Sequence, residues 1–322
     1  MNHPVEHNLS PIQKQTLTCF DSDLLRDVIR GASFDLHQVG KGSFQADMFH
    51  ASIGKGILDS SRYSNSILTE GTISQDNMTF GFIHDSKEDS IFNGNRLQKH
   101  DVMMGDEGGP LASCITAGTH WSSFQFKRDD LLKLGITLEK DNNKVLHFNQ
   151  ETQKDLSSKL GGILNYLEKE DDEKVAQINT ELLYHHILGI YANALDHIKD
   201  VSHLKRDESL LLSKKILTYL KEHANQPIQM IELTALTGKS ERTIERIFKK
   251  HFGIAPYAYL KIHRLHRIQN NLLHAENPIN TCIGDIAIQN GFMHMGYFGS
   301  EYKKIFGETP SETLQKKYIS TY

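Results

Sequence analysis

The chain has few cysteines and no long apolar segment. Cys19, Cys114 and Cys282 lie far apart, without the paired spacing of a disulfide framework or a zinc site. No run of about 18 apolar residues occurs, so the sequence predicts no transmembrane helix. The first residues, MNHPVEHNLSPIQKQ, lack the apolar core of a secretory signal. These absences favour a protein of a reducing cytoplasm without a membrane partner.

The chain also lacks the overall positive charge that is typical of nucleic-acid-binding proteins, because its formal net charge is −4. The charge is unevenly distributed, however. Residues 206–322 hold 16 Lys and Arg against 11 Asp and Glu, a formal +5, while the remainder holds 20 against 29, a formal −9. The C-terminal third therefore either binds a polyanion or has a solvated basic surface.

The length of 322 residues predicts two domains, and composition divides them. Residues 1–30 are polar and are interpreted as an N-terminal tail. Residues 31–150 contain short alternating runs punctuated by Gly, Ser and Asn, which predict strands and turns of a small barrel or sandwich. The predicted fold class is α+β, with an N-terminal β-barrel plus helices and an all-α C-terminal domain.

Residues 151–205 are predicted to form a helical region. Leu156, Leu160 and Leu164 recur at helical spacing, and a second apolar stripe runs from Val175 to Ile198. These two amphipathic helices could cover the strands of the same chain or pair with a second subunit, which would make a homodimer. The segment 199–209, KDVSHLKRDES, is interpreted as an exposed linker.

The last region, residues 206–322, predicts about seven short helices and contains an internal repeat. Gly238 corresponds to Gly291, and Phe248-Lys249-Lys250 corresponds to Tyr302-Lys303-Lys304. Each copy reads helix, glycine-containing turn, helix, near residues 231–252 and 283–306. This is the helix-turn-helix pattern, in which the second helix can lie in the major groove of DNA.

In the first copy, helical spacing separates an apolar face from a charged one. Arg242 and Arg246 are four residues apart and share a face on which an arginine can bind guanine O6 and N7. Ser240 is positioned to cap the helix, and the following lysines are suited to phosphate contacts. The candidate DNA-binding residues of this copy are Ser240, Arg242, Thr243, Glu245, Arg246, Lys249 and Lys250.

The second copy has a similar apolar set, but its outward residues have little hydrogen-bonding reach. Its candidate DNA-binding residues are Met295, Gly296, Gly299, Ser300, Lys303 and Lys304. We therefore expect the first copy to read most bases and the second to hold mainly the phosphate backbone.

The C-terminal third resembles the DNA-binding domain of the AraC/XylS family of transcription regulators. The resemblance is carried by Ile244-x-Arg246-x-Phe248-Lys249, Gly253-Ile254-Ala255-Pro256, Asp285-Ile286-Ala287, Gly291-Phe292 and Phe306-Gly307. It implies two helix-turn-helix units joined by a long helix near Pro256–His274, and contacts in successive major grooves. By position, it implies base-facing roles for Arg242, Glu245 and Arg246 in the first unit, and for Met295, Gly296, Gly299 and Ser300 in the second.

This sequence departs from the family pattern at three places. Ile268-Gln269 stands where the joining helix often has Ala-Arg, Ser300 stands where the second recognition helix commonly has Arg, and Thr234 stands where the first unit typically has Ala. The N-terminal half resembles the cupin-like sensing domain of part of the family, through Phe34-x-Leu36, Gly40-x-Gly42-x-Phe44 and Trp121-x-x-Phe124-x-Phe126.

Trp121, Phe124 and Phe126 are candidate effector-binding residues, with core packing as the alternative. No catalytic residues are identified, and the scattered histidines lack metal-ligand spacing, so no metal, cofactor or enzymatic activity is predicted.

The sequence thus predicts a cytoplasmic, nucleoid-associated activator that binds double-stranded DNA and is controlled by a small-molecule effector. The resemblance adds RNA polymerase as a partner. The alternative is a cupin-type metal-dependent enzyme, or a ligand-binding protein, with an appended DNA-binding domain.

Overall fold

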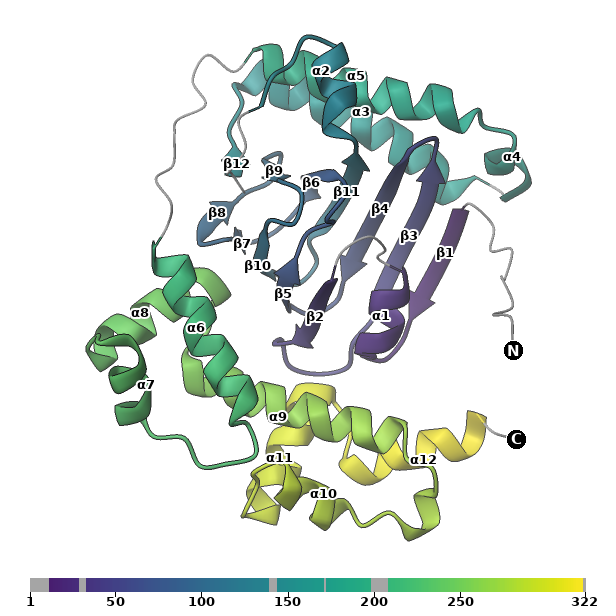
Figure 1. Ribbon diagram of the computed structural model, residues 1–322. Coiled ribbons are helices and arrows are strands. Elements are labelled where there is room, and N and C mark those ends of the chain that lie inside the picture. Colours follow the sequence, from purple (N-terminus) through teal and green to yellow (C-terminus); the bar gives the residue numbers. More distant parts are fainter. Residues whose placement is uncertain (1–11, 29–32, 139–143, 171, 198–207, 321–322) are drawn as a thin grey trace, which may run out of the picture.

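The computed structural model describes residues 12–28, 33–138, 144–170, 172–197 and 208–320 (Figure 1). It has two regions, an N-terminal β domain with associated helices and a C-terminal helical domain, so the predicted α+β class is confirmed. Within the described residues, no helix combines the length and apolar character needed to cross a bilayer.

The β domain consists of two antiparallel sheets. The seven-stranded sheet has the order β1 (Ile12–Leu17), β3 (Ala46–Ile53), β4 (Gly56–Tyr63), β11 (His120–Phe126), β6 (Met78–Asp85), β9 (Val102–Gly105) and β12 (Lys144–Leu146). The five-stranded sheet has the order β2 (Ser33–Gln38), β5 (Ile67–Thr72), β10 (Pro110–Ile115), β7 (Ser90–Phe92) and β8 (Asn95–Leu97).

The interpretation of residues 1–30 as a tail is wrong for residues 12–28. Residues 12–17 form β1, which pairs with β3 from Ile12 opposite Ala51 to Leu17 opposite Ala46. Helix α1 (Ser22–Val28) follows and buries Leu25. The segment IQKQTL is too polar to indicate a strand by itself, and its backbone hydrogen bonds to β3 supply what its side chains lack. Residues 1–11 lie outside the described residues.

Helices α3 (Gln150–Lys169) and α5 (Thr180–Asp196), with the short α2 (Arg128–Lys133) and α4 (Asp172–Ala176), cover the seven-stranded sheet (Figure 1). The predicted leucine stripe of α3 is buried there, and Tyr184 and Tyr191 of α5 pack on Phe124. The apolar stripes of both helices are thus covered by the same chain. Leu182, which the predicted stripe includes, is 68% exposed, so it lies outside the buried face that Tyr184, Ile187 and Tyr191 form.

The C-terminal domain contains seven α-helices among the described residues, as the sequence predicts. They are α6 (Glu208–Glu222), α7 (Met230–Thr237), α8 (Glu241–Phe252), α9 (Pro256–Leu273), α10 (Ile283–Gln289), α11 (Met295–Phe306) and α12 (Pro310–Ser320), with a 3₁₀ turn at Pro278–Asn280. One core joins α6 to α9, and a second joins α9 to α12. Most of the predicted linker 199–209 lies outside the described residues, and its last two residues begin α6.

Candidate nucleic-acid interface

The first helix-turn-helix unit is α7, a short turn and α8. Helix α7 ends at Gly238, whose φ of 65° lies in the left-handed region that glycine adopts without steric cost. Ser240 is the N-cap residue of α8, as predicted, but its side chain forms no capping bond to the backbone. The Ser240 hydroxyl instead lies 2.9 Å from Oγ1 of Thr243. The position of the cap is therefore correct and its expected hydrogen bond is not formed.

Helix α8 has one buried and one exposed face. Ile244, Ile247, Phe248 and Phe252 are buried. The candidate residues Arg242, Glu245, Arg246, Lys249 and Lys250 are exposed, as is Glu241, and Thr243 is half-buried. Among the described residues, neither Arg242 nor Arg246 forms an ion pair, so both guanidinium groups are available to an external acceptor.

The second unit, α10 and α11, repeats this geometry. Gly291 in its turn has a φ of 83°, and Phe298 and Tyr302 of α11 are buried. The candidate residues Met295, Gly296, Ser300, Lys303 and Lys304 are exposed, and Gly299 is half-buried. The hydroxyl of Ser300 donates to the carbonyl of Tyr297 at 2.9 Å, and Nζ of Lys304 lies 3.5 Å from Glu301.

Two further exposed side chains belong to this surface and were not predicted. Met293, in the turn, is 63% exposed, and Tyr297, in the first turn of α11, is 54% exposed. Their apolar character was the available signal, because a large apolar side chain outside the core face of a helix often marks a binding surface.

The long helix α9 joins the two units and buries Leu265, Ile268 and Leu272. Its Lys261 forms an ion pair with Glu301 of α11. Nη2 of Arg264 donates to the carbonyl of Gln226 at 2.6 Å. The joining helix is thus tied to both units, which limits changes in their separation.

The β domain packs directly on the joining helix and on the second recognition helix. Nε2 of Gln38, in β2, donates to the carbonyl of Ile305 at 2.7 Å, and Nε2 of His266 lies 3.0 Å from the carbonyl of Gln38. The backbone N–H of Gly42 reaches the carbonyl of Ile305 at 3.1 Å. These bonds connect β2, at one edge of the five-stranded sheet, and the loop after it to α9 and to the C-terminal end of α11.

Three imidazoles cluster in the same interface, where His37 and His266 are buried and His263 is half-buried. Nε2 of His37 lies 3.1 Å from Nδ1 of His263, and the ring centres of His37 and His266 are 5.3 Å apart. Burial lowers the pKa of His263 to about 3 and that of His266 to about 4. Burial and the neighbouring imidazoles also lower the pKa of His37 well below its ordinary value. The cluster is therefore neutral at pH 7.

A charged network crosses the interface beside these histidines. The hydroxyl of Tyr259, in α9, donates to Oε1 of Glu70 at 2.6 Å. Nζ of Lys221, in α6, lies 2.6 Å from Oδ2 of Asp35 and 2.9 Å from Oε1 of Glu70. Burial raises the pKa of Glu70, so its carboxylate depends on these two donors for stabilisation.

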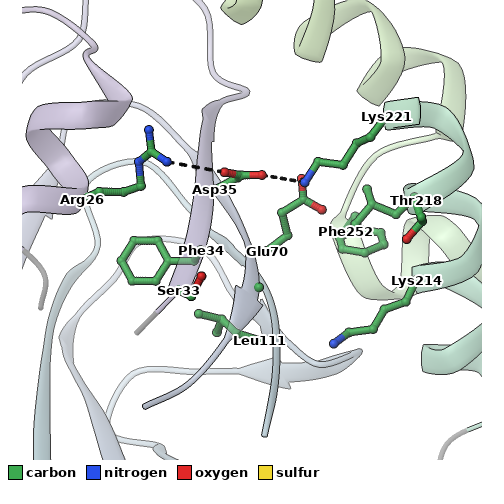
Figure 2. A pocket seen from close by; sticks show the side chains of 12 residues that line it. Arg26, Ser33, Phe34, Asp35, Glu70, Leu111, Lys214, Thr218, Lys221 and Phe252 are labelled. Carbon is green, nitrogen blue, oxygen red and sulfur yellow. Dashed lines mark hydrogen bonds and ion pairs between the residues drawn. The ribbon is translucent and has the colours of Figure 1, made fainter. Parts of the chain in front are cut away.

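A pocket of about 450 Å³ lies between the two regions at this network. Figure 2 shows its charged lining, which comes from α1, β2, β5 and α6: Arg26, Asp35, Glu70, Lys214 and Lys221. Its apolar wall includes Phe34, Leu111, Leu217 and Phe252.

The structure does not bring the three predicted effector-binding residues together at a pocket. Phe124 and Phe126 point away from the space between the sheets and are buried against the helical layer. Trp121 faces the space between the sheets, where its ring centre lies 6.1 Å from that of Tyr63. Because successive residues of a strand face opposite sides, Trp121 cannot share a face with the other two. All three pack in the core, and neither described pocket includes them.

His84, His120 and Glu168 lie near one another in the β domain and α3. Nε2 of His120 lies 3.4 Å from Oε1 of Glu168, and burial lowers the pKa of His84 to about 3. In the part of the chain that the structure describes, no three His, Cys, Asp or Glu side chains have an arrangement able to hold a metal ion.

A family described as a helix-turn-helix domain matches residues 233–316. A probable thc operon regulatory protein from Rhodococcus erythropolis is 37% identical over 97 residues, which are 30% of this chain and 29% of that protein. The XylDLEGF operon transcriptional activator of Pseudomonas putida is 28% identical over 159 residues, 49% of each chain. The matches thus span half or less of these relatives.

Among solved structures, the crystal structure of a probable AraC family transcriptional regulator from Rhodopseudomonas palustris CGA009 is 34% identical. It covers 33% of this chain and 97% of that chain, with a TM-score of 0.31. The curated relatives named here are transcription regulators and not enzymes, in agreement with the sequence prediction. With two helix-turn-helix units joined by α9 and a family match across residues 233–316, the chain is a member of the AraC/XylS family in its C-terminal domain.

Proposed function

We propose that this protein is a sequence-specific, DNA-binding transcription activator whose two recognition helices insert into successive major grooves. The observation that carries the proposal is the exposed face of α8, on which Arg242 and Arg246 have no intrachain ion pair among the described residues. An unpaired guanidinium on a recognition helix can bind guanine through two hydrogen bonds.

The candidate residues of the two recognition helices divide into three roles in this proposal. Arg242, Glu245 and Arg246 face bases in the first groove, and Met295, Gly296, Gly299 and Ser300 face bases in the second. Lys249, Lys250, Lys303 and Lys304 contact phosphates and displace counterions. Ser240 and Thr243 fix the start of α8, where their hydroxyls lie 2.9 Å apart.

Control by a small-molecule effector belongs to the same proposal. The β domain supports it because hydrogen bonds from β2 reach the C-terminal end of α11, while the pocket lies between β2 and α6. A ligand that changes how β2 packs on α9 and α11 would change how the β domain holds the two recognition helices for DNA. The expected partners are double-stranded DNA, the effector, RNA polymerase and a second copy of the chain.

The homodimer would use the outer face of the helical layer, because the inner stripes of α3 and α5 are buried in this chain. The exposed Tyr166 and Leu182 are apolar residues of α3 and α5 available to it. Sedimentation of the full chain tests this: Leu182→Glu should shift a dimer to a monomer, while Leu211→Glu, on α6, should not.

The experiment that tests the main proposal selects binding sites for the full chain from random DNA at low salt. Wild type should enrich a bipartite sequence with half-sites one helical turn apart. Arg242→Ala plus Arg246→Ala should lose the first half-site. Lys159→Ala removes one positive charge on α3 and should bind like wild type. Enrichment of no sequence by the wild-type chain would contradict the proposal.

A further inference from the structure

The second helix-turn-helix unit brings two sulfur atoms to the same place. A Cβ added to Gly284, in α10, would lie 3.8 Å from Sγ of Cys282 and 4.0 Å from Sδ of Met295. Cys282 directly precedes α10 and Met295 is the first residue of α11, so each helix of the unit supplies one sulfur (Figure 1). Because Gly284 has no side chain, nothing from that residue fills the space beside the two sulfurs.

The fold uses neither of these sulfur atoms. Cys282 is the N-cap residue of α10, but its side chain forms no capping hydrogen bond, and the residue is exposed as a free cysteine. Met295 is 38% exposed, whereas Phe298 of the same helix is buried in the core. The thiol and the thioether are therefore both accessible to a ligand from solvent.

An imidazole stands next to the thioether. His294 directly precedes Met295 as the N-cap residue of α11, and its side chain forms no capping hydrogen bond and is exposed. Within the described ranges of the chain, the imidazole of His294 has no hydrogen bond and no ion pair. The first residues of α10 and α11 thus present a thiol, a thioether and an imidazole.

This set of donors is suited to a soft cation. Zinc is bound by cysteine, histidine and carboxylate side chains, and no three of these are arranged for a metal in the part of the chain that is described. A metal site at this position therefore needs the thioether of Met295. Thiolate and thioether sulfur together select copper(I), and imidazole is also a copper ligand.

We propose that the second helix-turn-helix unit binds one copper(I) ion between Sγ of Cys282 and Sδ of Met295, with the imidazole of His294 as a third donor. Methionine has three rotatable bonds, so its sulfur can reach the ion without a movement of α11. The thiol of Cys282 releases its proton as the copper–sulfur bond forms, and the net charge of the site does not change.

The consequence for DNA binding rests on the function proposed above. Met295 is a candidate base-facing residue, and its thioether cannot contact a base and copper(I) at the same time. Copper(I) and the second half-site should therefore compete for this face of α11. Since the net charge is unchanged, the competition is steric and should leave the phosphate contacts of Lys303 and Lys304 in place.

The test is an anaerobic titration of the full chain against copper(I) held by bicinchoninate, whose colour fades as the protein takes the metal. Wild type should remove one equivalent, and X-ray absorption at the copper edge should show sulfur and nitrogen donors. Zinc, measured with a zinc-responsive dye, should bind much more weakly. Retention of all copper by bicinchoninate, or zinc binding as tight as copper(I) binding, would overturn the proposal.

Single substitutions localise the site. Cys282→Ser and Met295→Leu should each weaken copper(I) binding about tenfold or more, and His294→Gln should weaken it less. Cys19→Ser removes a half-buried thiol of the β domain and should bind copper(I) like wild type. Met230→Leu, at the first residue of α7, is the matched control for Met295→Leu. Unchanged copper affinity in Met295→Leu would refute the site.

Folding and DNA binding are measured separately on the same variants. Without copper, Cys282→Ser should have the melting temperature and the DNA affinity of wild type, because Cys282 is exposed and is not a candidate DNA-binding residue. Copper(I) should weaken DNA binding several-fold in wild type and not in Cys282→Ser. Equal DNA affinity with and without copper(I) would refute the competition.

The metal site and the proposed function can fail independently. If wild type selects a DNA sequence but binds no copper(I), the metal site is refuted and the DNA-binding function stands. If copper(I) binds through Cys282 and Met295 but no DNA sequence is selected, the proposed function is refuted and the metal site stands.

Discussion

His37 of the β domain and His263 of the joining helix approach each other through their ring nitrogens, with Nε2 of one 3.1 Å from Nδ1 of the other. One nitrogen must carry a proton and the other must accept it, so at least one ring is neutral. His266 lies against the same pair, and the surrounding charges are Lys221, Arg267 and Asp35. The contact between the two regions thus depends on neutral imidazoles.

This relationship predicts that acid weakens the interface. The pKa of His263 is about 3 and that of His266 about 4, below the ordinary 6.5, so the separated state binds more protons between those values. Stability of the closed arrangement is therefore complete above pH 6.5 and is lost as the pH falls toward 4, at about 1.4 kcal/mol per pH unit for each histidine. Urea unfolding of the full chain, measured at pH values from 7.5 to 5, gives the change in unfolding free energy with pH. His263→Gln should flatten the slope, whereas the exposed His274→Gln should not; equal slopes in all three proteins would contradict the prediction.

The Tyr259–Glu70 hydrogen bond predicts a coupled loss of stability. Tyr259→Phe removes one of the two donors to a buried carboxylate, and should cost about 1–3 kcal/mol of unfolding free energy. Glu70→Gln should cost less on the Tyr259→Phe background than on wild type, because the charge that needed the donor is gone. Chemical denaturation of wild type, the two single variants and the double variant gives the coupling energy. Additive losses of unfolding free energy would show that Tyr259 and Glu70 act independently.

The two kinds of basic residue on α8 should respond differently to mutation. Arg242→Ala should cost about 1–3 kcal/mol of DNA-binding free energy and relax preference at one base pair. Lys249→Ala should weaken binding to all sequences similarly and reduce the slope of log K against log salt by about 1. Fluorescence anisotropy on the selected site and on single-base variants distinguishes them. A uniform loss from Arg242→Ala would assign that residue to the phosphate backbone.

The second recognition helix should read thymine methyl groups. Met293 and Met295 are exposed, Gly296 and Gly299 leave room for close approach, and the Ser300 hydroxyl already donates to Tyr297. Apolar contact is then the available form of base readout. Replacing thymine by deoxyuridine in the second half-site should weaken binding several-fold in wild type and little in Met293→Ser plus Met295→Ser. The same replacement in the first half-site is the control.

Two glycines offer a matched test of the contact between the regions. Gly238 and Gly307 both have left-handed φ, 65° and 76°, so alanine is strained at either position. A Cβ on Gly238 meets nothing within 4 Å, whereas one on Gly307 lies 2.7 Å from the backbone nitrogen of Ser43. Gly307→Ala should therefore destabilise the chain more than Gly238→Ala in thermal unfolding. Equal losses of thermal stability in the two variants would indicate that backbone strain alone causes the destabilisation.

The sequence alone determined the two-region organisation, the internal repeat and the two faces of each recognition helix. These features follow from periodicity and backbone sterics within a few residues: Ile244 and Phe248 are buried because their spacing is helical, and Gly238 and Gly291 adopt positive φ because they have no Cβ.

Only the tertiary structure decided the strand at residues 12–17, the opposite faces of Trp121 and Phe124, the histidine cluster and the pocket around Lys214. Each depends on partners distant in sequence: His37 meets a residue 226 positions away. Contacts at such separations follow from how whole sheets and helices pack, and no local pattern of residues encodes them.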